Sequence, residues 1–355
     1  MLKLHQRQKN LCLHAMSMVA ALLFACEPDR TTNNDVPPDE FSNLAYRPAD
    51  EYLVDVFEGY TVQDALRKRS IKILLRYPLG APNPLPLIVW SHGGGANPDG
   101  HNTYREWGEA LAAAGYAVIH LAHEDDVYNA HCAALRIPAS ECEPRDFERE
   151  VAQGGTLDVL WLNRARDASA VLDDLAGIEA ATGLQFHRTR IAAAGHSGGA
   201  HTVVTLAGVY LDISPSVHNL RAHDLRFSAF LACSPQGIGR LGLNENSWSS
   251  LSAPMMVQTG AADMTAEENA ASRRDAFMHM PPPEKYLLYI DSPAATHNAF
   301  ALSLAPGDTT LTPFLKASAL AFFDAYLRNR AAAKEWLASG KINQWSRSLA
   351  QITKK

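Results

Sequence analysis

The sequence predicts an α/β fold in which a mostly parallel central sheet is covered by helices on both faces. Short apolar runs of strand length alternate with longer segments of helical periodicity, the pattern of parallel strands joined by crossover helices. At one junction the apolar run Ile191–Ala194 ends in a glycine-rich turn, and small apolar residues follow at helical spacing. The composition, 47% hydrophobic and 20% charged, is that of a globular protein, and one large domain accounts for 355 residues.

The expected elements follow one another from residue 52 onward. Strands are expected at Tyr52–Phe57, Ile71–Tyr77, Leu85–Trp90, Ala117–Leu121, Ile191–Ala194, Phe227–Ala232, Pro254–Thr259 and Lys285–Ile290, the last strand. Helices are expected at His101–Ala114, Thr156–Ala180, Ala200–Val209, Ala266–Met278 and Leu315–Ala338. Gly115 is a C-cap for the first helix, and Pro281-Pro282-Pro283 ends the fourth. The domain is expected at 51–340, with irregular insertions near 124–153 and 211–226 and a C-terminal tail at 341–355.

The first 25 residues have the pattern of a secretory signal peptide. Three basic residues precede the apolar segment Leu11–Ala25, which is too short to span a bilayer comfortably. The ending Leu23-Phe24-Ala25-Cys26 resembles a bacterial lipoprotein signal in which Cys26 carries the lipid, although Phe24 is atypical there. Simple cleavage to a secreted protein is the alternative. A start at Met16 or Met18 would remove the basic region and weaken the prediction.

Residues 26–50 are expected to form a flexible tether. Four prolines and few apolar residues lie between Glu27 and Asp50. Removal of residues 1–25 would take the formal net charge from −6 to −9, because it deletes three basic and no acidic residues. A chain of that charge has no electrostatic footprint for nucleic acid. A membrane contact is expected only through a lipid anchor. The sequence gives no indication of the oligomeric state.

Two cysteines in the first insertion suggest a local disulfide. Cys132 and Cys142 are ten residues apart in a polar stretch of a chain expected to be exported. A metal site is the weaker interpretation, because no Cys-x-x-Cys or paired-histidine spacing accompanies them. Cys233 would then stay unpaired as a small buried residue, and Cys12 would leave with the signal peptide.

Gly195-His196-Ser197-Gly198-Gly199 fits the pattern Gly-x-Ser-x-Gly between a strand and a helix. In that setting a tight turn holds the serine hydroxyl at the end of a sheet, and the glycines are needed where neighbouring turns pack closely. A serine hydroxyl is a poor nucleophile and needs an adjacent base. The alternative is a glycine-rich turn with an incidental serine.

The base and its acid are expected on loops at the carboxyl ends of the strands. His297 follows the strand Lys285–Ile290, and its alternative reading is a surface histidine. Asp263 follows the strand before it and could instead cap a helix near Thr265. The order Ser197, Asp263, His297 is that of α/β-hydrolases. Asp291 is the rival for the acid.

Two backbone amides are expected to stabilise an oxyanion. One belongs to Gly198, directly after the serine. The other should come from the loop His92-Gly93-Gly94-Gly95; Gly94 is our choice, and Gly93 and Gly95 are the alternatives. This set needs no metal and no organic cofactor.

The chain also resembles a known family over about residues 50–330. The segments similar to the platelet-activating-factor acetylhydrolase and dienelactone-hydrolase-like group of α/β-hydrolases are Ser91-His92-Gly93-Gly94-Gly95, Gly115-Tyr116-Ala117-Val118, His123-Glu124-Asp125, Arg166-Asp167, Val171-Leu172-Asp173, Gly195-His196-Ser197-Gly198-Gly199 and Ser234-Pro235-Gln236-Gly237. Polyester-hydrolase and cutinase-like bacterial enzymes share much of this layout. Dienelactone hydrolases proper use a cysteine nucleophile where this chain has Ser197, which favours ordinary carboxylic esters.

The resemblance and the triad together imply a serine esterase acting on a small-molecule or lipid-like ester. The alternative from another class is a non-catalytic protein of the same fold that binds a ligand or partner at the cell surface. Among enzymes, a polyester hydrolase, a lipase or a serine peptidase would share the triad. The sequence shows no large apolar lid helix, which disfavours a true lipase.

Overall fold

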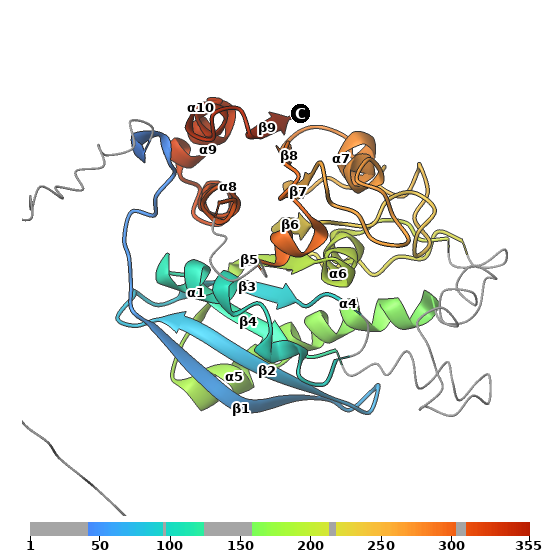
Figure 1. The fold of residues 1–355 in the computed structure, drawn as a ribbon. Helices are drawn as coiled ribbons and strands as arrows, with labels where there is room; N and C mark the ends of the chain where they lie inside the picture. Colours follow the sequence, from blue (N-terminus) through green and yellow to red (C-terminus); the bar gives the residue numbers. More distant parts are fainter. Residues whose placement is uncertain (1–41, 95–96, 124–157, 213–217, 303–309) are drawn as a thin grey trace, which may run out of the picture. The chain divides into compact units, whose positions relative to one another are not determined.

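The computed structural model describes residues 42–94, 97–123, 158–212, 218–302 and 310–355. A nine-stranded sheet runs through them in the order β1-β2-β4-β3-β5-β6-β7-β8-β9 (Figure 1). The strands are β1 (Val54–Asp64), β2 (Arg69–Pro78), β3 (Leu85–Ser91), β4 (Ala117–Leu121), β5 (Phe186–His196), β6 (Ala229–Cys233), β7 (Met255–Gly260), β8 (Lys285–Ile290) and β9 (Ala350–Lys354). Six neighbouring strands of this sheet, β4, β3, β5, β6, β7 and β8, are parallel to one another, whereas β1, β2 and β9 pair antiparallel with their neighbours. The predicted α/β class with a mostly parallel sheet is confirmed.

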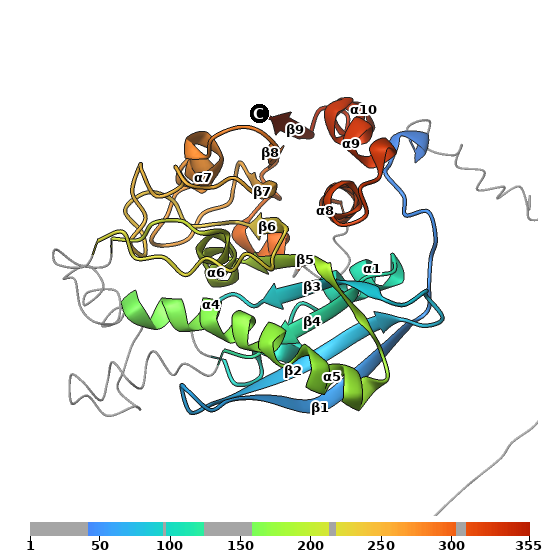
Figure 2. The same ribbon diagram turned by 180° about the vertical axis from the view of Figure 1, so that it is seen from behind.

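Helices cover both faces of the sheet, as Figures 1 and 2 show from opposite sides. They are α1 (Arg105–Ala113), α4 (Asp158–Asp173), α5 (Leu175–Thr182), α6 (Gly198–Ala207), α7 (Asp275–His279), α8 (Thr312–Tyr326), α9 (Ala331–Ala338) and α10 (Lys341–Trp345), with 3-10 turns at Ser42–Leu44, Gly100–Asn102, Ser272–Arg274 and His297–Ala301. Buried side chains of α4, α5, α6 and α7 belong to one apolar cluster, and those of α1, α8, α9 and α10 to a second. None of the helices described is long and apolar enough to cross a membrane.

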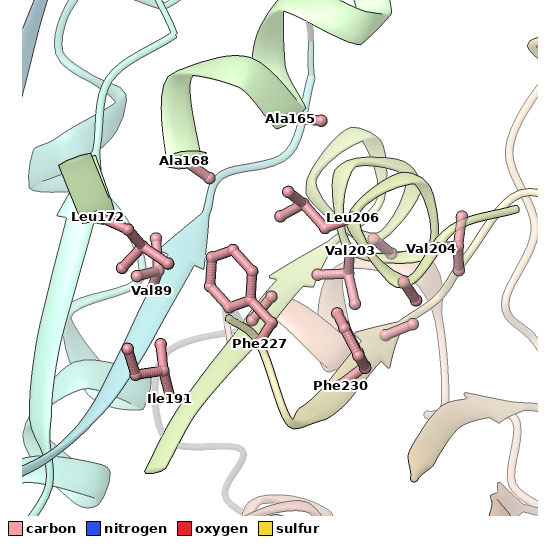
Figure 3. Packing of buried hydrophobic residues seen from close by; sticks show 14 of the residues in the cluster. Val89, Ala165, Ala168, Leu172, Ile191, Val203, Val204, Leu206, Phe227 and Phe230 are labelled. Carbon is pink, nitrogen blue, oxygen red and sulfur yellow. The ribbon is translucent and has the colours of Figure 1, made fainter. Parts of the chain in front are cut away.

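The central strands read as continuous apolar runs because both of their faces are buried. Along β3, Leu87 and Val89 enter the first cluster, and Ile88 and Trp90 enter the second. Figure 3 shows Val89 beside residues of α4 in the first cluster. Complete burial of one such side chain stabilises the fold by about 1.5–3 kcal/mol.

Four predicted helices are wrong in extent. The helix expected at His101–Ala114 begins only at Arg105, because Tyr104 before it has a left-handed φ of 56°. The single helix expected at Thr156–Ala180 is interrupted by Asp174, whose φ and ψ of −100° and 18° are not helical and which separates α4 from α5. Leu315–Ala338 divides into α8 and α9 around Asn329, which has φ of 52°. Only the end of Ala266–Met278 is helical, because the Asn269 side chain accepts the amides of residues 271 and 272 and so competes with the helix.

The expected C-terminal tail at 341–355 is also wrong, because these residues form α10 and β9. Strand β9 pairs with β8 from Ala350↔Ile290 to Lys354↔Tyr286, so β8 is neither the last strand nor an edge. The short, polar segment Ala350–Lys354 lacks an apolar run that would mark it as a strand. Its pairing follows from the unpaired backbone groups that β8 would otherwise expose.

The folded unit begins before the predicted boundary at residue 51. Tyr46 donates to Asp324 at 2.7 Å and lies 5.6 Å from the ring of Trp336, and the Trp336 indole donates to the Leu44 carbonyl at 2.8 Å. Leu44 and Tyr46 therefore contact α8 and α9, and this part of the expected tether belongs to the folded unit.

Several other predictions fall outside the described residues: the signal peptide, the tether up to residue 41, the insertion from 124 to 153, and Cys26, Cys132 and Cys142. In the second insertion, Leu211 and Leu220 form an isolated bridge. Cys233 is described, and its thiol is free and buried.

Candidate active site

Ser197 occupies a strained turn between β5 and α6. Its φ and ψ are 53° and −120°, a conformation that costs a non-glycine residue roughly 1–3 kcal/mol. The flanking glycines explain how the turn fits: a Cβ on Gly199 would lie 2.0 Å from the Ser91 carbonyl oxygen, and one on Gly195 would lie 2.6 Å from Gly199. The turn leaves the Ser197 side chain partly exposed at the carboxyl end of the sheet.

The structure brings Ser197, His297 and Asp263 together. The Nε2 atom of His297 lies 2.9 Å from Ser197 Oγ, and its Nδ1 lies 3.0 Å from Asp263 Oδ1. Asp263 and His297 follow β7 and β8, and the parallel bridge between Ala262 and Thr296 holds the two loops side by side. The rival, Asp291, is exposed, and its amide binds the Leu349 carbonyl.

Asp263 is fully buried among donors. The hydroxyls of Ser234 and Thr259 each donate to its carboxylate at 2.7 Å, and Arg273 Nε lies 3.6 Å away. Burial acts to raise the pKa of Asp263, but the hydrogen bonds from His297 and Ser234 and the charge of Arg273 outweigh it. The pKa of the carboxyl therefore lies below its ordinary value, and the group is ionised at neutral pH.

Ser234 is a neighbour of the triad that the sequence analysis did not assign to the site. Its Oγ is 2.7 Å from both Asp263 Oδ1 and His297 Nδ1. The hydroxyl can donate to the carboxylate while its oxygen accepts from the imidazole N–H. Ser234 follows β6 directly, with φ of 52°, so its position at a strand end was the available signal.

Of the three glycines considered for the second oxyanion donor, the contacts engage the Gly93 amide elsewhere and leave Gly94 as the candidate among the described residues. The Gly93 amide donates to the Tyr104 hydroxyl at 2.9 Å, and Gly95 lies outside the described residues. Gly198 begins α6, so its amide has no partner within the helix. A Cβ on Gly198 would lie 2.5 Å from the Gly94 carbonyl oxygen, which places the two candidate residues side by side.

A second chain of hydrogen bonds links the loop of Gly93 to that of His297 through His196. The Tyr104 hydroxyl lies 2.9 Å from His196 Nδ1, and His196 Nε2 lies 2.9 Å from the His297 carbonyl. A carbonyl only accepts, so Nε2 carries the proton and Nδ1 accepts from Tyr104. Burial, then the charge of His297, lowers the pKa of His196 to about 3, which keeps this ring neutral.

Two other features of the described residues bear on ligands. The described residues contain no cluster of three or more His, Cys, Asp or Glu side chains that could hold a metal ion. A surface cleft of about 570 Å³ lies at the amino ends of β3 and β4, where Pro86, Gly115 and Arg190 line it, and it contains none of the triad residues.

Comparison of the chain with protein-family models and with curated proteins found no match in either. Any functional assignment therefore depends on the contacts of the site. Those contacts place a serine hydroxyl in hydrogen-bond reach of an imidazole that a buried carboxylate orients.

Proposed function

We propose that the protein is a serine hydrolase that cleaves carboxylic esters through an acyl-enzyme, on an α/β-hydrolase fold related to the platelet-activating-factor acetylhydrolase and dienelactone-hydrolase-like group. The observation that carries the proposal is the continuous chain from Ser197 Oγ through His297 to Asp263, with the Gly198 amide beside the serine. Nucleophile, base and orienting acid within hydrogen-bond distance are the arrangement that activates a serine.

In the proposed acylation, Ser197 Oγ attacks the ester carbonyl carbon while His297 Nε2 takes the hydroxyl proton. The carbonyl electron pair moves to its oxygen, and the amides of Gly198 and Gly94 stabilise that oxyanion. When the intermediate collapses, the bond to the alkoxy oxygen breaks and His297 returns the proton to the leaving alcohol. Asp263 holds the ring with Nδ1 protonated and stabilises the imidazolium.

Deacylation repeats these steps with water as the nucleophile. His297 takes a proton from water, the hydroxyl oxygen bonds to the acyl carbon, and the bond to Ser197 breaks. The serine recovers its proton from His297, and the carboxylic acid leaves. These residues complete the cycle by proton transfer and charge stabilisation.

The test is the Ser197→Ala variant, assayed on p-nitrophenyl esters of increasing acyl length and with a fluorophosphonate probe. We expect the variant to fold and to lose both labelling and at least about 10⁴-fold in kcat/KM, because the nucleophile is gone. Ser228→Ala is the matched control, because this half-buried serine donates to the Ile191 carbonyl, away from the triad.

Retained activity in Ser197→Ala, or labelling of another serine, would contradict the proposal. Wild-type protein that is folded but neither hydrolyses esters nor reacts with the probe would favour a non-catalytic binding protein instead.

A further inference from the structure

Arg164 of α4 reaches under the loop that carries the Gly94 amide. Its side chain is buried, and its guanidinium donates through Nη2 to the His92 carbonyl and through Nη1 to the Gly94 carbonyl, the latter at 2.5 Å. A Cβ on Gly198 would lie 2.8 Å from Nη1, so the same group also lies beside the other oxyanion donor. One guanidinium thus binds the loop that carries the Gly94 amide and lies beside Gly198, which carries the other amide.

These contacts determine the direction of three consecutive peptide groups. In a trans peptide the carbonyl and the N–H point to opposite sides. Arg164 binds the carbonyls of His92 and Gly94, and His92 Nδ1 lies 2.8 Å from the Gly93 carbonyl between them. His92 Nε2 accepts the His123 amide at 3.1 Å, so Nδ1 carries the proton and donates. His92 therefore holds the peptide group that carries the Gly94 N–H, which points away from the His92 ring, and Arg164 holds the carbonyls on either side of it.

The charge of Arg164 also acts on this loop. Burial, followed by the charge of Arg164, lowers the pKa of His92 to about 2, so the imidazole stays neutral. The same charge opposes the rise that burial causes in the pKa of Tyr104. A positive charge at this place favours negative charge that develops nearby.

The start of the loop is held from the same helix. Ser91 Oγ lies 2.7 Å from His123 Nε2, and His123 Nδ1 lies 3.0 Å from Asp167 of α4. Although these contacts repeat the serine–imidazole–carboxylate chain of a catalytic triad, all three residues are buried, so a substrate cannot reach Ser91. Their contacts anchor the end of β3, one turn of α4 away from Arg164.

We propose that Arg164 is a positioning residue for the oxyanion site: it aligns the loop His92–Gly94 so that the Gly94 amide faces the oxyanion, and its charge lowers the energy of that oxyanion. This inference rests on the proposed ester hydrolysis. The guanidinium suits the task because its planar fork can bind two carbonyls at once. The benefit arises in the transition state, so it should appear in kcat and not in KM.

The experiment measures hydrolysis of p-nitrophenyl acetate and binding of phenylboronic acid, which forms a tetrahedral adduct with a catalytic serine. We expect Arg164→Met to lower kcat about 10²-fold, with KM within about threefold, and to weaken boronate binding by the same factor as kcat. Arg164→Lys keeps the positive charge but lacks the planar guanidinium that can bind two carbonyls at once, and we expect kcat to fall about tenfold. Fluorophosphonate titration counts folded sites, so misfolded protein does not enter kcat.

The matched control is Arg76→Met, which removes another buried arginine, from β2, where Arg76 pairs with Val118 of β4. It should leave kcat per titrated site and boronate affinity within about threefold of wild type. If Arg164→Met does not fold, Arg164→Lys decides the question by the same two measurements.

Values of kcat and boronate affinity within threefold of wild type in a folded Arg164 variant would overturn the inference. A rise in KM without a change in boronate affinity would do the same. If wild-type protein neither hydrolyses the ester nor binds the boronate, the proposed function itself is refuted and this inference with it, whereas active wild type with unaffected Arg164 variants refutes the inference alone.

Discussion

At the scale of single residues, two carboxylates compete for the role of orienting His297. Asp263 is buried and lies 3.0 Å from His297 Nδ1, whereas Asp291 is exposed at the end of β8. We expect Asp263→Asn to lose about 10³-fold or more in kcat, with substrate binding little changed, because the amide cannot stabilise the imidazolium. Asp291→Asn is the matched control and should stay within about tenfold of wild type, since an exposed bystander carboxylate contributes at most ~1 kcal/mol. The reverse pattern would assign the role to Asp291.

Tyr104 joins the loops of Gly93 and His297 through one hydroxyl. Tyr104→Phe leaves the Gly93 amide without its acceptor and the buried Nδ1 of His196 without its donor. We expect a loss of about 1–3 kcal/mol in the free energy of unfolding and a fall of about tenfold in kcat, with KM nearly constant. Urea unfolding and ester kinetics measure the two effects.

The control for this substitution is Tyr77→Phe, because the Tyr77 hydroxyl donates to Asp55 on the surface of the β1–β2 pair. It should change neither quantity appreciably. Equal kinetic effects of the two substitutions would show that the Tyr104 hydroxyl has no positioning role.

At the scale of secondary structure, β9 protects the strand that leads to His297. Five residue pairs join β9 to β8, from Ala350↔Ile290 to Lys354↔Tyr286. We expect deletion of residues 347–355 to lower the melting temperature by roughly 5–10 °C and to promote aggregation, because it uncovers the edge of β8. Scanning calorimetry and light scattering test this expectation.

Gln351→Ala is the control for the deletion, because it changes an exposed side chain and keeps every backbone bond of β9. Its melting temperature should be that of wild type within about 1 °C. An unchanged melting temperature after the deletion would mean that β9 contributes nothing to the stability of the sheet.

At the scale of the whole molecule, buried histidines predict sensitivity to acid. Burial lowers the pKa of His92 to about 2, of His196 to about 3 and of His201 to about 4, and it holds the pKa values of His120 and His123 well below their ordinary value. In the unfolded chain these rings take up protons near pH 6.5, whereas the folded protein excludes them. Their contribution to stability is therefore complete above pH 6.5 and is lost as the pH falls.

Proton uptake by each of the five rings in the unfolded chain should lower the free energy of unfolding by about 2 kcal/mol between pH 7 and pH 5. The five effects together are comparable with the whole stability of a typical domain. Asp167 and Glu268 oppose this in part, because burial raises the pKa of each carboxyl and the folded state then binds the extra protons. We expect the urea midpoint to fall steeply between pH 7.5 and pH 5.

His120→Leu provides the comparison, because the His120 ring is buried beside Trp90 of the second apolar cluster. The variant should show a pH dependence about one fifth weaker than that of wild type. A midpoint that is constant over this range would contradict the predicted uptake of protons on unfolding.

The sequence by itself determined the features that depend on a few neighbouring residues. Apolar runs and helical spacing predicted the α/β class and six parallel strands, because backbone periodicity is local. The glycines around Ser197 indicated the tight turn, because a Cβ has no room there. The positions of Asp263 and His297 after successive strands indicated that they meet, since parallel strands end at one edge.

Only the tertiary structure decided which distant residues support this site. Arg164 and Gly94 are 70 positions apart, and Tyr104 and His196 are 92 apart, so no local pattern connects them. Likewise, β9 becomes a strand because β8 has an open edge, not because Ala350–Lys354 has a strong strand pattern of its own. Such contacts depend on strand order and register, which bring separate segments together only when the whole sheet has formed.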